Sequence, residues 1–234
     1  MKISVIIPTL NEVAIIADQV RSIQSKSIGK DVEIIVADAY SNDGTAEKAA
    51  EAGAKVISVA KCCRAKQMNA GANEATGEVL YFVHADLTVP DSFVEDIFDG
   101  VNNGHHYGCY MVTFDRPVKG LKFNSSLSKY QGIFFRGGDQ TLYMTKSFFD
   151  KIGGFDDSVV IMEDYEILLR ARPHQKIHIM PNQVIISARK MEQNNYFRTN
   201  VINVLVFTLF FLGASQKTLV SIYQRNVKGA KYSI

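Results

Sequence analysis

The sequence predicts an α/β protein with a mostly parallel central sheet flanked by helices. Strand-like apolar runs alternate with helical patterns through the first 90 residues, and polar residues follow the ends of those runs. The 234-residue chain is 47% hydrophobic and 21% charged, which is typical of a globular protein with a substantial core. Strands that alternate with helices at this spacing indicate β-α-β units and a parallel sheet.

The first half of the chain carries the clearest pattern. We expect the first strand at "KISVIIPT", because a continuous β-branched run is typical of a parallel strand buried on both faces. A helix is expected over residues 11–25, where apolar residues from Val13 to Ile23 recur at helical spacing and Asn11 is the N-cap. The pattern then predicts, in order, a strand at "VEIIVADA", a helix at "AEKAAEAGA", a strand at "KVISVA", a helix at "RAKQMNAGANEA" and a strand in "VLYFVHADLTVP".

The alternation becomes less regular after residue 90. A helix is expected at about 91–101, and "YGCYMVTF" is typical of a strand. "MEDYEILLRAR" predicts an amphipathic helix, and "KIHIM" and "VIISA" predict two short strands. The C-terminal part is expected to be helical. The second half therefore completes the sheet.

Composition excludes several classes of protein. The net charge of +2 argues against binding to nucleic acid or to an anionic membrane through whole-chain attraction. The three cysteines, Cys62, Cys63 and Cys109, contain no C-x-x-C pair, which favours a reduced cytosolic protein over a disulfide framework or a zinc site. Pro8 interrupts the N-terminal apolar run, so no signal peptide is expected.

The C-terminal region contains one membrane-like run, "VINVLVFTLFFLGA", at residues 201–214. It includes Asn203 and Thr208 and is shorter than the ~20 residues needed to cross a bilayer. Three roles remain open for it: packing in the core, a homodimer surface, or peripheral contact with a membrane. We favour core packing or dimerisation.

Polar residues follow three of the expected strands, in the groups Thr9, Asn11 and Glu12; Asp38, Ser41 and Asp43; and His84 and Asp86. Parallel sheets bind ligands beyond the carboxyl ends of their strands, so these groups predict a binding edge. The dinucleotide fingerprint and the phosphate loop are absent, and a nucleotide would be held otherwise. Asp38 ends a buried strand and needs a partner, which favours a ligand contact. Asp43 fits a turn role equally well.

Two further groups carry charge. Asp86 suits Mg²⁺ or Mn²⁺, which prefer carboxylate oxygens, although a turn or a helix cap explains one aspartate as well. Arg64, Lys66, Gln67 and Asn69 open a helix, where basic side chains favour a phosphate-bearing ligand; the alternative is a solvated helix face. Glu163 and Asp164 begin another helix, where capping explains them equally. Neighbours on a helix point ~100° apart, so only one of the two can serve as a general base.

The motifs "SVIIPTLNE", "VADAYSNDGT", "RAKQMNAGANEATGEVLYFVHAD", "GGDQ" and "MED" occur in the order found in family 2 glycosyltransferases of the GT-A fold. The long third block resembles the branch called rSAM/selenodomain-associated transferase 2. The resemblance runs from residue 3 to about 190 and implies one GT-A domain over residues 1–190. Its nucleotide-binding half would be about 1–90 and its acceptor-side half about 91–190, with 191–234 as a helical extension.

The resemblance also implies residue roles. Asp164 would be the catalytic base, and Asp86 would be the metal ligand on the donor diphosphate. Nucleotide and donor contacts are implied for Pro8, Asn11, Glu12, Asp38, Asp43, Arg64, Asn69 and His84. Asp139, Gln140 and Glu163 would lie on the acceptor side. His84 replaces the first aspartate of the family's D-x-D motif, and a neutral imidazole supplies no negative charge, which predicts a lower metal affinity.

The implied activity is transfer of a sugar, with inversion, from a UDP- or GDP-sugar to an acceptor hydroxyl, assisted by Mn²⁺ or Mg²⁺. The acceptor is unknown, and the expected location is the cytoplasm or the inner face of the membrane. Two alternatives remain open. A nucleotidyltransferase usually needs a Gly-rich basic loop near the N-terminus, which "PTLNEVA" does not provide. The other alternative is a sugar-nucleotide binding protein without turnover.

Overall fold

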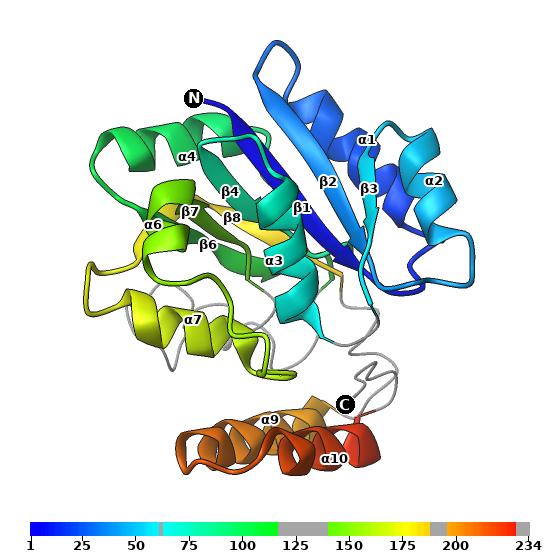
Figure 1. Ribbon diagram of the computed structural model, residues 1–234, viewed down its shortest axis with the longest axis vertical. Helices are drawn as coiled ribbons and strands as arrows, with labels where there is room; N and C mark the ends of the chain where they lie inside the picture. Colours follow the sequence, from blue (N-terminus) through cyan, green and yellow to red (C-terminus); the bar gives the residue numbers. More distant parts are fainter. Residues whose placement is uncertain (61–62, 117–139, 188–195, 228–234) are drawn as a thin grey trace.

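A mixed sheet forms the middle layer of this computed structural model, which describes residues 1–60, 63–116, 140–187 and 196–227 (Figure 1). Within those residues the sheet has eight strands in the order β3-β2-β1-β4-β7-β6-β8-β5. The strands are β1 (Ile3–Thr9), β2 (Val32–Asp38), β3 (Lys55–Ser58), β4 (Val79–Phe82), β5 (Leu87–Thr88), β6 (Tyr107–Phe114), β7 (Leu142–Thr145) and β8 (His178–Ile186).

The two halves of the chain pair their strands differently. β1 lies between β2 and β4 and is parallel to both, and β3 extends this parallel part beyond β2. In the second half β7 is antiparallel to β4 and to β6, whereas β8 is parallel to β6 and antiparallel to β5. The expected parallel arrangement is therefore confirmed for the first four strands, and the second half makes the sheet mixed.

The prediction of two short strands near the end of the domain is wrong, because β8 is continuous. Its pairing with β6 shifts from Tyr110↔Met180 to Met111↔Gln183, so residues 181–182 form a bulge. Pro181 occupies that bulge and lacks the N–H that a regular ladder would require. The proline that separated the two predicted strands is thus accommodated inside one.

Helices cover both faces of the sheet. They are α1 (Ile16–Lys26), α2 (Thr45–Glu51), α3 (Arg64–Glu74), α4 (Phe93–Asn102), α6 (Lys146–Lys151), α7 (Glu163–Ala171), α9 (Tyr196–Phe211) and α10 (Gln216–Asn226). α1 begins five residues later than expected, and its N-cap is Ile15. The predicted N-cap role of Asn11 is therefore wrong, because the residues between β1 and α1 form a loop that is hydrogen-bonded to the loop after β2.

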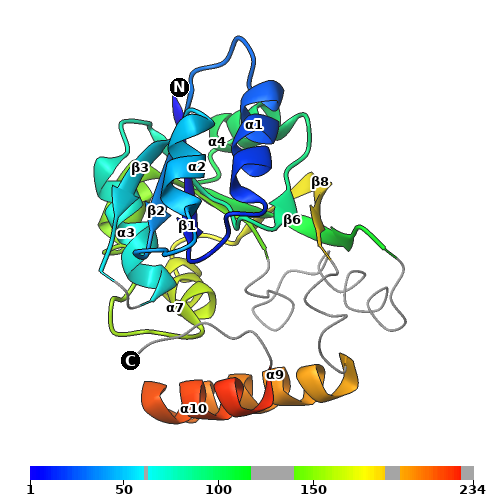
Figure 2. The same cartoon turned by 90° about the vertical axis from the view of Figure 1, so that its right-hand side faces the viewer.

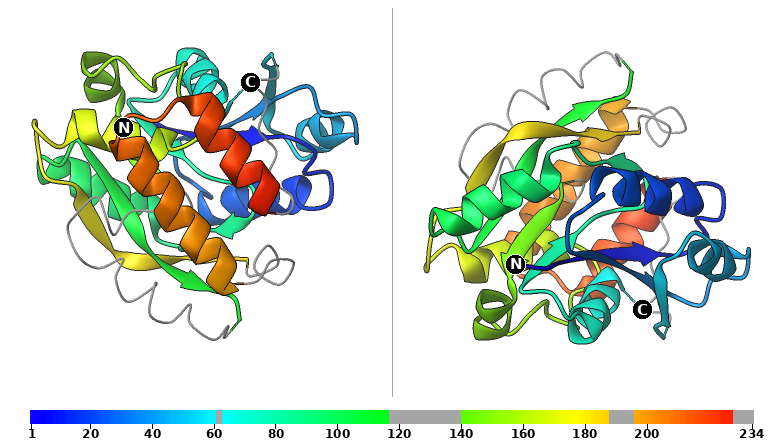
Figure 3. Two further views of the ribbon diagram at one scale, coloured as in Figure 1. Left: turned by 90° about the horizontal axis from the view of Figure 1, so that it is seen from below. Right: turned by 90° about the horizontal axis from the view of Figure 1, so that it is seen from above.

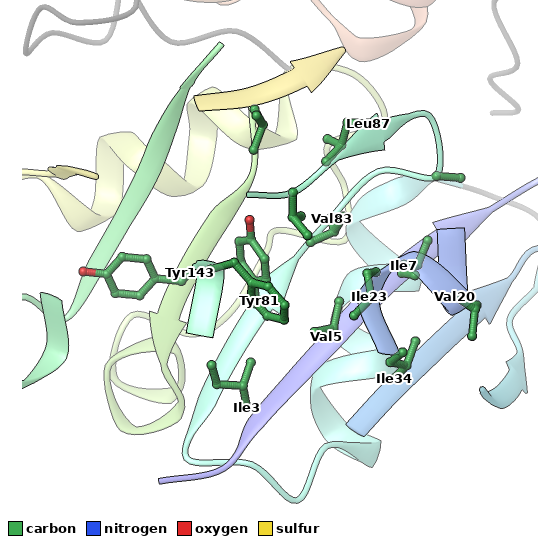
Figure 4. Packing of buried hydrophobic residues seen from close by; sticks show 14 of the residues in the cluster. Ile3, Val5, Ile7, Val20, Ile23, Ile34, Tyr81, Val83, Leu87 and Tyr143 are labelled. Carbon is green, nitrogen blue, oxygen red and sulfur yellow. The ribbon is translucent and has the colours of Figure 1, made fainter. Parts of the chain in front are cut away.

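Each face of the sheet carries its own hydrophobic core. Successive side chains of a strand point to opposite faces, so Ile3, Val5 and Ile7 of β1 enter one core and Ile6 enters the other. The first core is closed by α1, α2 and α4, and Figure 4 shows β1 side chains packed beside Val20 of α1. The second core is closed by α3, α6 and α7. These layers hold the strand ends in place from both sides.

α3 packs closely on β1 because Gly71 has no side chain. A Cβ at this position would lie 2.4 Å from Cγ2 of Ile6, a distance that no real contact tolerates. Glycine destabilises a helix interior, and the close packing of α3 on β1 compensates for that cost. The approach brings the first turn of α3 over the ends of β1 and β2.

The carboxylate of Glu33, at the amino end of the sheet, accepts several hydrogen bonds. Oε1 of Glu33 accepts hydrogen bonds from Ser4 Oγ at 2.5 Å, Thr76 N at 2.7 Å and Thr76 Oγ1 at 2.8 Å. Burial would raise the pKa of Glu33, but these hydrogen bonds and the charge of Lys2 outweigh it and lower the pKa to about 2. The folded state therefore binds this proton more weakly than the unfolded chain.

We expect Glu33→Gln to remove a stabilising contribution that depends on pH. The folded pKa of about 2 lies below the ordinary value of 4.5, so the contribution is complete above pH 4.5 and is lost as the pH falls toward 2. The variant should lose about 2 kcal/mol of unfolding free energy at pH 7 and little at low pH. Urea unfolding between neutral pH and pH 3 measures this; an equal loss at every pH would contradict it.

The last two helices form a hairpin beneath the sheet layers, and both views in Figures 1 and 2 show it as a separate layer. Figure 3 shows α9 and α10 side by side from below. Ile202, Val206, Leu219 and Val220 pack with Ile161 in a third cluster, so one side of the hairpin is buried against the segment before α7. Oε1 of Gln216 accepts from the backbone N–H groups of Val160 and Ile161, both at 3.0 Å. In the described residues no helix is long and apolar enough to cross a membrane.

Candidate functional site

The ends of β1 and β2 lie side by side, with Thr9 opposite Asp38. Asp38 is only 2% exposed, and its carboxylate accepts from Thr9 Oγ1 at 2.8 Å, Ser41 N at 2.7 Å and Ser41 Oγ at 2.6 Å. The partner that a buried carboxylate requires therefore comes from the chain itself, which corrects the inference that Asp38 needs a ligand. A contact between Asp38 and a base remains a prediction.

Hydrogen bonds join the loop after β1 to residues 41–45, which follow β2 and begin α2. Asn11 N donates to Ser41 Oγ at 2.8 Å, and Asn11 Oδ1 accepts from Asn42 N at 3.1 Å. Glu12 N donates to Thr45 Oγ1 at 2.8 Å, and Val13 N donates to an oxygen of Asp43 at 3.2 Å. The two polar groups predicted at these strand ends thus form one unit.

Asp43 has the turn role that its sequence context suggested. Its Oδ1 accepts from Thr45 N at 3.1 Å and from Thr45 Oγ1 at 2.5 Å. Slight burial would raise the pKa of Asp43, but the hydrogen bonds from Thr45 and Val13 outweigh it and lower the pKa. The carboxylate therefore stays charged at this edge. Pro8 is buried inside β1, and its role in lining a pocket stays a prediction.

Gln67 of α3, for which a place near a phosphate-bearing ligand or on a solvated helix face was predicted, is a structural residue. It is 4% exposed, and its Nε2 donates to the carbonyl oxygens of Thr9 at 2.8 Å and Ala37 at 2.7 Å. These carbonyls lie where β1 and β2 end. The side chain therefore fixes the two strand ends relative to α3.

Asn69, two residues further along α3, connects to the segment before α7. Its Nδ2 donates to Phe155 O at 2.8 Å and to Asp157 Oδ1 at 2.7 Å, and its Oδ1 accepts from Phe155 N at 2.9 Å. The side chain is thus occupied by contacts within the chain. Its predicted place near a nucleotide stays untested.

Arg64 and Glu163 bring the starts of α3 and α7 together, as Figure 1 shows for the two helices. Arg64 Nε lies 2.7 Å from Glu163 Oε1, and the side chains are 32% and 1% exposed. Removing a carboxylate from water is costly, and this ion pair offsets the cost. The two residues were predicted to contact nucleotide and acceptor separately, yet the structure pairs them with each other.

Asp164 differs from its neighbour in exposure. Glu163 is buried, whereas Asp164 is only partly buried, although they are consecutive in the first turn of α7. Consecutive helix residues point about 100° apart, which accounts for the difference. Met162 precedes them with φ of 75°, in the left-handed region, and its carbonyl accepts from the N–H groups of Tyr165 and Glu166. Glu163 and Asp164, which we call the acid pair, therefore begin α7 directly after a residue with a strained backbone conformation.

Backbone strain is concentrated at this edge. Among the described residues, the non-glycine residues with positive φ are Asn11, Tyr40 and Met162. They lie after β1, after β2 and before α7. Such conformations cost about 1–3 kcal/mol each and collect at functional sites. Tyr40 is also 64% exposed and was not among the predicted site residues, although an aromatic residue just after a strand-end aspartate was a usable signal.

His84 and Asp86 lie in the short connection between β4 and β5. The carbonyl of His84 accepts from Gln19 Nε2 at 3.5 Å, and that of Asp86 accepts from Ser187 N at 3.2 Å. The backbone is thus held from α1 on one side and from the end of β8 on the other. Both side chains are partly exposed.

The described residues bring no group of three His, Cys, Asp or Glu side chains together for a metal ion. A divalent cation at Asp86 would then take its other ligands from phosphate oxygens and water, which is how Mg²⁺ is commonly bound beside nucleotides. The donor set present therefore fits a substrate-completed site. Of the residues predicted for the acceptor side, Gln140 is partly buried, and Asp139 lies outside the described residues.

A cavity of about 370 Å³ opens on α10 rather than at the strand ends. It is lined by Lys217, Val220, Ser221, Gln224 and Arg225. We place the candidate site at the strand ends because the paired loops lie there and α3 connects them to the start of α7, through Gln67 at the strand ends and Arg64 beside Glu163. None of these features lines the cavity.

Comparisons with known proteins show the family of the chain and its fold. The family model described as Glycosyl transferase family 2 matches residues 4–162. A dolichol-phosphate mannosyltransferase of Pyrococcus furiosus is 34% identical over 127 residues, and the match covers 52% of this chain and 35% of that protein. The matched part of this chain therefore spans only about a third of that relative's length.

Two solved structures share the fold. The mannosyltransferase PcManGT of Pyrobaculum calidifontis, in complex with GDP-Man and Mn²⁺, superposes with a TM-score of 0.67 at 18% identity, covering 98% of this chain and 66% of that one. S. aureus TarS 1-349 gives 0.66 at 17% identity, covering 95% and 69%. The fold is thus the GT-A fold of these transferases, as the sequence motifs predicted.

Proposed function

Because this chain belongs to glycosyl transferase family 2, we propose that it transfers a sugar, with inversion, from a nucleotide-diphosphate sugar to an acceptor hydroxyl. The observation that carries the proposal is the start of α7. There a buried Glu163, neutralised by Arg64, fixes the helix turn that presents the partly exposed Asp164. A general base needs one carboxylate that is held rigidly and still reaches the substrate.

The donor is assigned to the strand-end edge in residues 1–90. Solved structures of this fold contain UDP, UDP-GlcNAc or GDP-Man, which supports a UDP- or GDP-sugar here. Asn11, Glu12 and Asp38 belong to the paired loops at this edge, and Tyr40 offers an exposed ring for stacking on a base. Arg64 and His84 flank the same edge. The acceptor is assigned to residues 91–190, with Gln140 and Asp139 on its side.

The reaction is a single displacement. Asp164 takes the proton of the acceptor hydroxyl while that oxygen bonds to the anomeric carbon, and the bond from that carbon to the diphosphate breaks on the opposite face. Asp86 would hold Mn²⁺ or Mg²⁺, and such an ion, when bound, neutralises charge on the departing diphosphate. Mn²⁺ accompanies the ligands in two of the similar structures, PcManGT and glucosyl-3-phosphoglycerate synthase of Mycobacterium tuberculosis.

The first test is a thermal-shift screen of UDP- and GDP-sugars with and without Mn²⁺. A ligand that binds the folded state raises its melting temperature, so we expect one sugar nucleotide to do so, more strongly with metal. Release of nucleoside diphosphate from that donor then measures turnover. Stabilisation by a donor without any turnover would favour a binding protein instead. Stabilisation by nucleoside triphosphates alone would favour a nucleotidyltransferase.

We expect Asp86→Ala to weaken metal-dependent nucleotide binding at least tenfold, since it removes the carboxylate assigned to the ion. Calorimetric titration of the selected donor, with Mn²⁺ and with EDTA, measures this. Asp91→Ala is the matched control, because this exposed carboxylate lies five residues further on and pairs with Lys26. Equal affinities for wild type and Asp86→Ala in the presence of Mn²⁺ would remove Asp86 from the site.

A further inference from the structure

The outer side of α9 carries an unusual concentration of exposed apolar side chains. In the described part of the chain nine large apolar residues are exposed, and five of them lie in α9 or directly after it. These five, which we call the apolar face, are Val201 (50%), Val204 (65%), Leu205 (42%), Phe211 (43%) and Leu212 (76%). A stable surface helix normally turns such residues inward.

The spacing places these residues on one side of the helix. At about 100° per residue, positions 201, 204, 205, 211 and 212 fall within an arc of about 120°. The opposite side holds Ile202 and Val206, which are buried in the third cluster against Ile161. The helix is therefore apolar on both sides, and the domain covers only one of them. Figures 1 and 2 show the hairpin as the lowest layer, so its uncovered side forms the base of the molecule.

The charges of the hairpin indicate which kind of partner covers the apolar face. Residues 196–227 contain Arg198, Lys217 and Arg225 and no aspartate or glutamate. Lys217 and Arg225 are exposed on α10 and line its cavity. An apolar face beside positive charges is the composition of helices that lie in the interface of an anionic membrane. A second copy would bring the same positive charges to a symmetric contact, which disfavours a homodimer through this face.

We propose that the α9–α10 hairpin docks the protein on an anionic lipid surface, with the apolar face in the interfacial region and the cations of α10 against lipid phosphates. α9 has 16 residues and would lie in the plane of the surface. Gln216 joins α10 to the backbone at residues 160–161, directly before the acid pair. Docking would therefore hold the start of α7 at about one helix diameter, ~10 Å, from the lipid.

A tryptophan reporter tests the docking directly, because the chain has no tryptophan. We expect the emission of Leu212→Trp to shift to shorter wavelength on addition of phosphatidylcholine vesicles containing about one third phosphatidylglycerol. Vesicles of phosphatidylcholine alone should cause a smaller shift. Ile28→Trp is the matched control, since Ile28 is 79% exposed and lies between α1 and β2. Unchanged emission of Leu212→Trp, or equal shifts in both variants, would overturn the proposal.

Co-sedimentation with the same vesicles separates the two contributions. The double variant Val204→Gln/Leu205→Gln should bind at least about tenfold more weakly, because it removes exposed apolar groups that no other residue replaces. Lys217→Gln/Arg225→Gln should weaken binding about fivefold per charge, and only to anionic vesicles. Arg21→Gln, at an exposed arginine of α1, should bind like the wild type. Circular dichroism confirms folding of each variant.

Sedimentation velocity without lipid tests the alternative that a second copy of the chain covers the apolar face. We expect a monomer at micromolar concentration. A dimer that Val204→Gln/Leu205→Gln dissociates would assign the apolar face to a second copy and refute the membrane proposal. Neither result depends on catalysis, so the docking proposal and the proposed activity fail or succeed separately.

Discussion

Asp164→Asn should reduce turnover of the selected sugar nucleotide by about 10²–10⁴-fold, because an amide cannot take the proton of the attacking hydroxyl. The affinity for the donor should stay within about twofold of wild type, since the base acts on the acceptor rather than on the nucleotide. Release of nucleoside diphosphate measures the first quantity, and calorimetric titration measures the second. The substitution preserves size and removes only the charge and basicity.

Asp150→Asn provides the control for this prediction. Asp150 is an exposed carboxylate of α6, outside the candidate site, and its substitution should leave turnover unchanged. A parallel fall in both variants would indicate a general effect of charge. Full turnover by Asp164→Asn would exclude Asp164 as the base, and a loss of donor affinity with unchanged turnover would place it on the donor side instead.

Arg64→Met should have the largest effect on stability. Glu163 is 1% exposed and lies 2.7 Å from Arg64 Nε, so the variant leaves a buried carboxylate without its cation. Breaking a buried pair in this way costs about 3–5 kcal/mol of unfolding free energy, and partial exposure of Arg64 places the expected loss near the lower end. Urea denaturation measures it. The cost arises from the uncompensated charge rather than from the absence of an attraction.

A double-mutant cycle distinguishes these causes. Arg64→Met/Glu163→Gln should recover most of the loss, because the amide needs no cation, and the coupling should exceed about 1 kcal/mol. Lys66→Met is the matched control, since Lys66 is an exposed cation two residues further along α3. It should change stability by less than about 0.5 kcal/mol. Additive losses in the cycle would show that Arg64 and Glu163 act independently.

Local patterns predicted the first half of the fold because each strand and helix there is specified by neighbouring residues. The β-branched runs of β1 and β2 and the apolar spacing of α1 required no long-range information. The bulge at Pro181 was not predictable in the same way. It depends on β6, about 70 residues earlier in the chain, which pairs with both parts of β8 across the proline. Pairing partners of this separation leave no local signal.

In the candidate site, too, features specified by neighbouring residues were predictable and long-range contacts were not. Polar residues after strands indicated the edge, since that inference depends only on strand direction. The partners of those residues could not be predicted. Gln67 and Asn69 have the sequence context of a solvated helix face, yet their hydrogen bonds reach strand ends and the segment before α7. The left-handed conformation of Met162 is also unforeseen, because methionine has no preference for it and the surrounding contacts impose it.

The bond between Gln216 and the backbone at residues 160–161 affects where the catalytic unit ends. A domain boundary drawn at residue 190 follows the family motifs, but a chain shortened there would leave two N–H groups without their acceptor and would uncover Ile161. Both losses would occur within three residues of the acid pair. The helical extension is therefore part of the smallest unit that can be expected to keep an ordered acceptor side, and it is no dispensable appendage.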